Sequence, residues 1–165
     1  MRSIYIEISQ RIRGECDELE RVIQRALRAW PHAQKSVSEQ EVYLDSVALN
    51  LHSFYSGLER IFELIARHID RSIPEGETWH RDLLKQMACD IVDLRPAVID
   101  QKTAWSLDEF RRFRHLVRNV YATNLVPDRI KQLMSTLPEL WKSLRAELFA
   151  FADFIDELAK VISDE

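Results

Sequence analysis

Apolar residues recur at every third or fourth position along most of this chain, which is the spacing of one face of an α-helix. The first run predicts a helix over residues 3–30, because the residue before Pro31 is pushed out of the α-helical region. Residues 38–41 (Ser-Glu-Gln-Glu) match a capping box. They predict the start of a long second helix that ends at Ile69 or Ile73.

Turn and capping residues divide the middle of the chain. Residues 72–78 have the composition of a turn, and Thr78 is the predicted cap of a shorter helix through Ile91. We expect residues 95–105 to be mostly loop, because Leu-Arg-Pro ends the helical pattern just before. A second capping box at residues 106–109 predicts a helix that ends near Asn124.

The last predicted helix carries a long apolar stripe. Pro127 lies near its first turn, and apolar residues recur from Ile130 to Leu158. Pro138 either kinks this helix or starts a new one. Short turns between helices favour antiparallel neighbours. The pattern therefore predicts an all-α fold, an antiparallel bundle of four long helices and one short helix, as a single domain over residues 1–165.

Composition agrees with a helical protein and narrows its location. Only three of 165 residues are glycine, and the net charge of −4 disfavours a protein that coats nucleic acid with its whole surface. A local basic site stays compatible with that charge. Cys16 and Cys89 are predicted to be buried free thiols, and we find neither a signal peptide nor an apolar run that could span a membrane. We expect a cytoplasmic protein.

Residues 110–121 have the highest density of side chains that could bind or react with a ligand: four arginines, one histidine and one tyrosine, with no acid. A helical projection groups the basic residues on one outward face: Arg111, Arg114, His115 and Arg118, with Tyr121 at its edge. The opposite, core-facing side then holds Phe113, Leu116, Val117 and Val120, with Phe110 at its margin. Guanidinium groups bind phosphate and histidine moves protons near neutral pH, so this face suggests an RNA phosphodiester as substrate.

Two interpretations of the basic face stay open. Charged helix faces are usually solvated and mix both signs, whereas these arginines crowd together and need a partner. That partner is either a bound anion or a carboxylate on the long second helix, with Asp45, Glu59 and Glu63 as candidates. The one-sided charge favours a functional face.

The remaining motifs give weaker evidence of function. No histidine has a zinc-ligand spacing, no carboxylates have a two-metal spacing, and there is no Gly-rich phosphate loop, so we predict neither metal nor cofactor. The other histidines are scattered, and His52 is interpreted as a core or edge residue. The four tryptophans are interpreted as core or dimer anchors rather than base-stacking platforms: Trp30, Trp79, Trp105 and Trp141.

Residues 114–121 (Arg-His-Leu-Val-Arg-Asn-Val-Tyr) resemble the HepT-like branch of the HEPN superfamily, whose ribonucleases carry Arg, four to six residues and then His, often followed by x-Tyr. Arg114 matches the arginine and Tyr121 the tyrosine. Asn119 stands where the family has its histidine, and asparagine is neither a base nor an acid at neutral pH. His115 lies beside it, where many HepT-like motifs have a polar asparagine.

The resemblance implies a homodimeric, metal-independent endoribonuclease, the toxin of a toxin–antitoxin pair acting on tRNA or mRNA. Arg114 would stabilise the phosphorane, His115 would be general base or acid, and Asn119 would orient the nucleotide. Arg111 and Arg118 would hold flanking phosphates. A nucleotidyltransferase antitoxin would transfer AMP to Tyr121, whose alternative role is ordinary packing at the edge of a face.

The departure at Asn119 leaves three explanations open. His115 supplies the proton transfer, or the protein is a catalytically degenerate module that binds RNA, a nucleotide or its nucleotidyltransferase partner, or the asparagine is an engineered replacement. A further class is a purely structural helical dimer, in which charge reversal on the arginine helix changes only solubility.

Overall fold

The computed structural model describes residues 2–35, 38–119 and 127–162, with the side chains of Arg118 and Asn119 outside the description. Five α-helices occupy these ranges: α1 (Arg2–Lys35), α2 (Gln40–Ile65), α3 (Trp79–Met87), α4 (Gln101–Asn119) and α5 (Pro127–Val161). The prediction of an all-α fold with four long helices and one short helix is confirmed.

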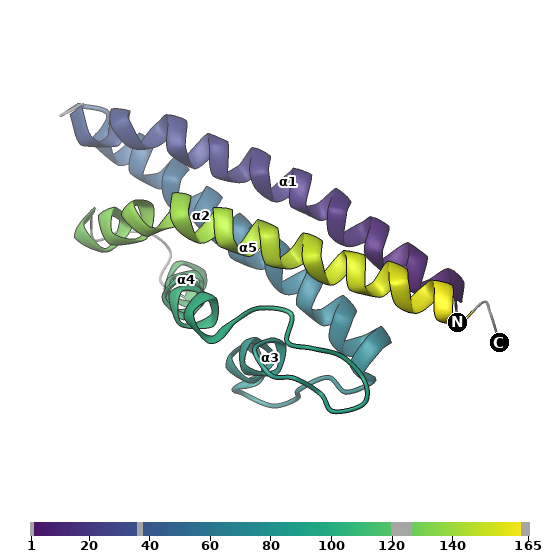
Figure 1. Cartoon of the computed structure of the whole chain (residues 1–165). Helices are drawn as coiled ribbons and strands as arrows, with labels where there is room; N and C mark the ends of the chain where they lie inside the picture. Colours follow the sequence, from purple (N-terminus) through teal and green to yellow (C-terminus); the bar gives the residue numbers. More distant parts are fainter. Residues whose placement is uncertain (1, 36–37, 120–126, 163–165) are drawn as a thin grey trace.

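The three longest helices form the body of the molecule. α1 packs against both α2 and α5 and runs antiparallel to each, so that the beginning of α1 and the end of α5 lie at the same end of the molecule (Figure 1). α3 and α4 pack on one side of this body and contact each other as well as α2. In Figure 1, α4 is seen almost along its axis, so it crosses the long helices.

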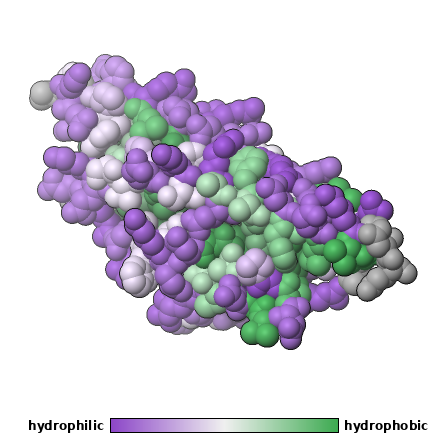
Figure 2. Space-filling view, in the orientation of Figure 1, coloured by the Kyte–Doolittle hydropathy of each residue, from purple (hydrophilic) through white to green (hydrophobic). Residues whose placement is uncertain are grey.

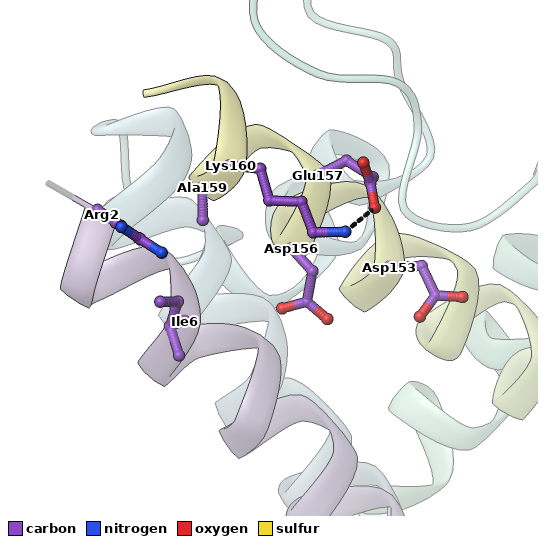
Figure 3. A pocket seen from close by; sticks show the side chains of 7 residues that line it. All are labelled: Arg2, Ile6, Asp153, Asp156, Glu157, Ala159 and Lys160. Carbon is purple, nitrogen blue, oxygen red and sulfur yellow. Dashed lines mark hydrogen bonds and ion pairs between the residues drawn. The ribbon is translucent and has the colours of Figure 1, made fainter. Parts of the chain in front are cut away.

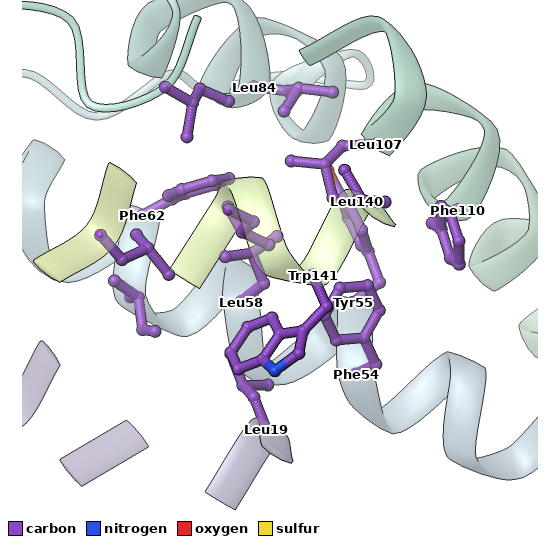
Figure 4. Close-up of a cluster of buried hydrophobic side chains, with 14 of the residues drawn as sticks. Leu19, Phe54, Tyr55, Leu58, Phe62, Leu84, Leu107, Phe110, Leu140 and Trp141 are labelled. Atoms are coloured by element: carbon purple, nitrogen blue, oxygen red, sulfur yellow. The ribbon is translucent and has the colours of Figure 1, made fainter. Parts of the chain in front are cut away.

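Apolar side chains from all five helices meet in one core. Phe54 of α2 makes edge-to-face contacts with Phe110 of α4 and Trp141 of α5, at 5.6 and 6.2 Å between ring centroids. Leu84 and Leu107 extend this core under α3 and α4 (Figure 4). On the face drawn in Figure 2, hydrophilic residues predominate, and hydrophobic residues reach the surface mainly in an irregular region over the middle and lower right of the view.

Two prolines lie inside helices. The predicted end of the first helix at Trp30 is wrong, because α1 continues through Pro31 to Lys35. The extra turn buries Ala33, whose carbonyl oxygen accepts a hydrogen bond from Gln40 Nε2 at 3.1 Å. Tertiary burial of this kind offsets the hydrogen bond that a proline removes.

Pro138 likewise neither ends α5 nor starts a new helix, which answers the alternative left open by the sequence. Its neighbours Leu137 and Trp141 are buried in the core. The predicted cap of the second helix at Ser38 is also wrong. α2 starts at Gln40, after Glu39, and no side chain caps it.

The start of α4 differs most from the prediction. The expected loop over residues 95–105 already contains the first turn of α4, because the helix is capped at Asp100 and not at Ser106. The Asp100 carboxylate accepts the Thr103 backbone N–H at 2.7 Å, and this hydrogen bond lowers the pKa of Asp100. Glu147 of α5 accepts both the Asp100 N–H and the Thr103 hydroxyl hydrogen, and burial raises the pKa of Glu147.

A buried arginine fixes the segment between α3 and α4. α3 ends at Met87, short of the predicted Ile91, which instead pairs with Arg95 in an isolated antiparallel bridge. The Arg95 side chain is fully buried against Asp70, the last residue of a π-helical turn (Ala66–Asp70) that continues α2. Two of its N–H groups bind the Asp70 carboxylate, and the other three bind backbone carbonyl oxygens: Gln86, Cys89 and Pro96.

Candidate functional site

The arginine helix buries Phe110 and Phe113 as its projection predicted, and Val117 packs partly against the core, but the buried face extends farther toward the arginines. Arg114 turns toward α2, and the side chains of Arg111 and Arg114 are only 19% and 14% exposed, whereas Leu116, predicted in the core, is 37% exposed. The cause is the earlier start of α4, which adds Ala104 to the apolar stripe and shifts the buried face toward Arg114. The stripe comprises Ala104, Leu107, Phe110 and Phe113.

Arg114 is held by two residues of α2. Its Nε donates a hydrogen bond to Ser56 Oγ at 2.9 Å, and its Nη2 lies 3.8 Å from Glu59 Oε1. Glu59 was one of three carboxylates expected as partners of the basic face, and the structure confirms it. A guanidinium has five N–H donors, so these contacts leave others for a bound anion.

Glu59 is a buried carboxylate that joins two helices to α2. Its side chain is 4% exposed, and its Oε2 lies 2.7 Å from His80 Nδ1 on α3. His80 in turn stacks on Trp79, with 3.6 Å between ring centroids. The sequence analysis missed His80, because nothing in the local pattern relates it to a glutamate 21 positions earlier.

Tyr55 lies one turn before Glu59 on α2 and is 1% exposed. Burial raises the pKa of Tyr55 above its ordinary value, and the nearby charge of Glu59 raises it further. Its hydroxyl therefore stays protonated across the physiological range, and the charge beside Arg114 is that of Glu59.

Two further arginines of α4, Arg111 and Arg112, contact the same carboxylate, and Arg112 also lies 3.7 Å from Glu109. Asp108 accepts a hydrogen bond from Arg111 Nε at 2.8 Å, and Arg112 Nε lies 3.0 Å from its other oxygen. Arg112 is more than half exposed, whereas Arg111 is largely covered. A phosphate at Arg111 would therefore compete with the Asp108 carboxylate.

His115 follows Arg114 directly and is exposed, so it is accessible to a ligand that reaches Arg114 from solvent. Arg118 and Asn119 belong to the last turn of α4, but their side chains lie outside the described part of the structure. Tyr121 also lies outside the described residues. Among the predicted site residues, the structure places Arg111, Arg114 and His115.

Other hollows suit this chemistry less well. One of about 520 Å³ lies between the start of α1 and the end of α5 (Figure 3). Three carboxylates line it, against two cations: Asp153, Asp156 and Glu157 against Arg2 and Lys160. Within the described residues, no group of three histidine, cysteine or acidic side chains is placed to hold a metal ion. None of the described helices combines the length and apolarity of a membrane span.

A family model described as HepT-like protein matches residues 46–155, two thirds of the chain. The chain belongs to the HepT-like family. No curated protein and no solved structure matches it significantly. The HepT-like match extends from α2 into α5 and includes Glu59, His80 and Arg114, so these three contacting residues all lie within the matched region.

Proposed function

We propose that this HepT-like protein is a metal-independent endoribonuclease that acts as a cytoplasmic homodimer and as the toxin partner of a nucleotidyltransferase antitoxin. The observation that carries the proposal is Arg114, held between Ser56 and Glu59 immediately before the exposed His115. A restrained guanidinium beside an accessible imidazole is an arrangement suited to phosphoryl transfer, in which positioning and charge stabilisation provide most of the catalysis.

Arg114 stabilises the negative charge that develops on the pentacoordinate phosphorus. The contacts with Ser56 and Glu59 restrict its rotamers before substrate binds, so little conformational entropy is lost on binding. Arg111 and Arg118 hold the flanking phosphates, and Arg111 exchanges its Asp108 contact for a phosphate when it does so.

His115 moves the protons of the reaction. The RNA 2′-oxygen attacks the adjacent phosphorus after losing its proton to one imidazole, and the 5′-oxygen leaves with a proton from another. A two-fold axis that pairs the α4 helices of two protomers provides both imidazoles. The products are a 2′,3′-cyclic phosphate and a 5′-hydroxyl, and Asn119 orients the nucleotide through its amide.

Tyr121 is the site at which the antitoxin acts. Transfer of AMP from ATP to its hydroxyl, with release of pyrophosphate, adds a phosphate two residues beyond Asn119. That phosphate pairs with the arginines of α4 and excludes RNA. Mass spectrometry after co-expression with a nucleotidyltransferase tests this step. An unmodified Tyr121, or inhibition that persists in Tyr121→Phe, contradicts it.

The decisive experiment is cleavage of RNA by the purified protein in EDTA. The wild type should give products ending in 2′,3′-cyclic phosphate, and Arg114→Ala and His115→Ala should each lose roughly 100-fold or more in rate. Lys142→Ala, an exposed cation on α5, is the matched control and should cleave normally. Unchanged cleavage by Arg114→Ala excludes the assigned role.

The second candidate function is a catalytically degenerate module that binds RNA, a nucleotide or its partner through the same face. Asn119, which stands in the position of the family histidine, favours it. Asn119→His separates the two candidates. A degenerate protein binds RNA without cutting it and gains cleavage on this substitution, whereas an enzyme that relies on His115 is active before it.

A further inference from the structure

A groove of about 700 Å³ lies between α3 and α4, and neither Arg114 nor its partners Ser56 and Glu59 line it. Its floor contains Leu84 and two small residues, Ala88 and Ala104, which are all buried. Because these side chains are small, a hollow remains between α3 and α4. Pockets of this size hold small organic ligands.

Cations line both sides of the groove. Arg81 and Lys85 are exposed on α3, and Arg112 faces them from α4. Asp108, the one carboxylate in the lining, already contacts Arg111 and Arg112. The lining thus carries three cations against one carboxylate in a chain whose net charge is −4, which favours an anion as ligand. Arg81 also lies 3.8 Å from Asp82 and Arg112 lies 3.7 Å from Glu109, so a bound phosphate exchanges with these exposed ion pairs.

An exposed indole forms part of the same lining. Trp105 is 74% exposed, so of the two roles expected for the tryptophans, core anchor or dimer anchor, it does not have the first, whereas Trp141 is buried in the core. An exposed aromatic ring among cations is the combination on which bases of single-stranded nucleic acid stack while phosphates pair with arginine and lysine.

The groove opens close to the candidate catalytic residues. Arg112 and His115 are separated by one helical turn of α4, so their side chains are neighbours on the helix surface. Asp108 lines the groove on one side and binds Arg111 on the other. An RNA strand at Arg114 therefore needs only a short extension to enter the groove.

We propose that the α3–α4 groove is a binding subsite for single-stranded RNA, in which one base stacks on Trp105 and the adjoining phosphates contact Arg81, Lys85 and Arg112. This subsite rests on the proposed function, since it extends the path of the same substrate. It selects an unpaired nucleotide beside the scissile bond, because a base within a duplex has no free face for the indole.

Binding is measured with a short fluorescein-labelled RNA whose 2′-oxygens are methylated, which prevents cleavage and separates binding from catalysis. Trp105→Ala should weaken binding about 5- to 150-fold, the range of one lost base–aromatic stack, while Trp105→Phe should retain most of the affinity. Arg81→Ala and Lys85→Ala should each reduce the salt dependence, log K against log salt, by about 0.7. Lys142→Ala should change neither quantity.

Cys89 provides a second readout without substitution. The predicted burial of both cysteines is wrong for Cys89, which lines the groove and is exposed. Cys16 is buried, and burial raises the pKa of its thiol to about 11. A thiol reagent should therefore label Cys89 first. Saturating methylated RNA should slow this labelling in the wild type and in Arg114→Ala, but much less in Trp105→Ala.

The outcomes distinguish this subsite from the proposed function. If the wild type binds and cleaves RNA but Trp105→Ala binds equally well, the subsite is wrong and the ribonuclease assignment stands. If the wild type neither binds nor cleaves RNA, both are wrong. If groove variants change the sedimentation coefficient but not RNA affinity, the groove is a protein–protein interface and the subsite is overturned.

Discussion

Arg114 and Glu59 form an ion pair across the α2–α4 contact, with 3.8 Å between Nη2 and Oε1 and a carboxylate that is 4% exposed. The pair places the candidate catalytic arginine against the core rather than in solvent. The same carboxylate also contacts His80 of α3, so the orientation of the Arg114 side chain depends on contacts among α2, α3 and α4.

Removal of the Glu59 carboxylate should therefore destabilise the protein strongly. Glu59→Ala is expected to lower the free energy of unfolding by about 3 kcal/mol, because it leaves Arg114 and His80 without their buried partner. Glu63→Ala, a half-buried carboxylate of the same helix, should change it by less than about 1 kcal/mol. Urea unfolding measures both, and similar losses for the two variants would contradict the role of Glu59.

Arg95 should be more sensitive to substitution than any exposed arginine. Arg95→Met removes the cation that balances the buried Asp70 carboxylate, which then keeps only the Gln86 amide as a donor within the described residues. It also leaves the Cys89 and Pro96 carbonyl oxygens without the Arg95 N–H groups, and should cost about 3–5 kcal/mol. Arg81→Met should cost less than about 0.5 kcal/mol, since Arg81 is exposed. Thermal unfolding of the two variants is the measurement, and equal midpoints would show that the buried network contributes nothing.

The cap of α4 should make stability depend on pH. Asp100→Ala is expected to lose about 1 kcal/mol at neutral pH. Because the folded state lowers the pKa of Asp100, this contribution is present above the unfolded pKa of about 3.9 and disappears as pH falls through the folded value. The difference in unfolding free energy between wild type and variant should thus shrink below about pH 4. A difference that stays constant at acid pH would contradict a charged cap.

Two helical glycines should respond oppositely to alanine. A methyl group at Gly14 would meet nothing within 4 Å, so Gly14→Ala should stabilise α1 by about 0.5–1 kcal/mol. A methyl group at Gly57 would lie 2.8 Å from a buried Leu19 methyl, so Gly57→Ala should destabilise the α1–α2 contact by about 1–2 kcal/mol. Equal melting-temperature shifts of the same sign would show that the close approach at Gly57 relaxes easily.

Local patterns predicted the helices well but located their ends poorly. The apolar periodicity of α2 and α5 depends on neighbours three and four residues apart, so one sequence contains it. The N-cap of α4, in contrast, cannot be recognised from neighbouring residues alone. Ser106 with Glu109 matched a capping box locally, whereas Asp100 is completed by Glu147 from another helix.

The same reasoning explains the partial success at the site. The unbalanced charge around Arg114 indicated that a partner was needed and left open whether it was a bound anion or one of three carboxylates on the second helix, of which the structure selects Glu59. Which face of α4 was buried depended on its first turn, and that turn was assigned to a loop. The exposure of Trp105 depends on how α3 packs against α4, and the pairing of His80 with Glu59 depends on how α3 packs against α2. No local pattern encodes either contact.

The anchors of α4 also constrain how the chain can vary in length. Asp100 is fixed to α5 through Glu147, and Arg114 is fixed to α2 through Glu59. The two residues lie about 21 Å apart along the α4 axis. Inserting one residue between them would turn the later part of the helix by about 100° and carry Arg114 away from Glu59. Insertions of two whole turns would preserve the angle but change the spacing. Homologous chains that keep both anchors should therefore differ here by substitution and not by insertion or deletion.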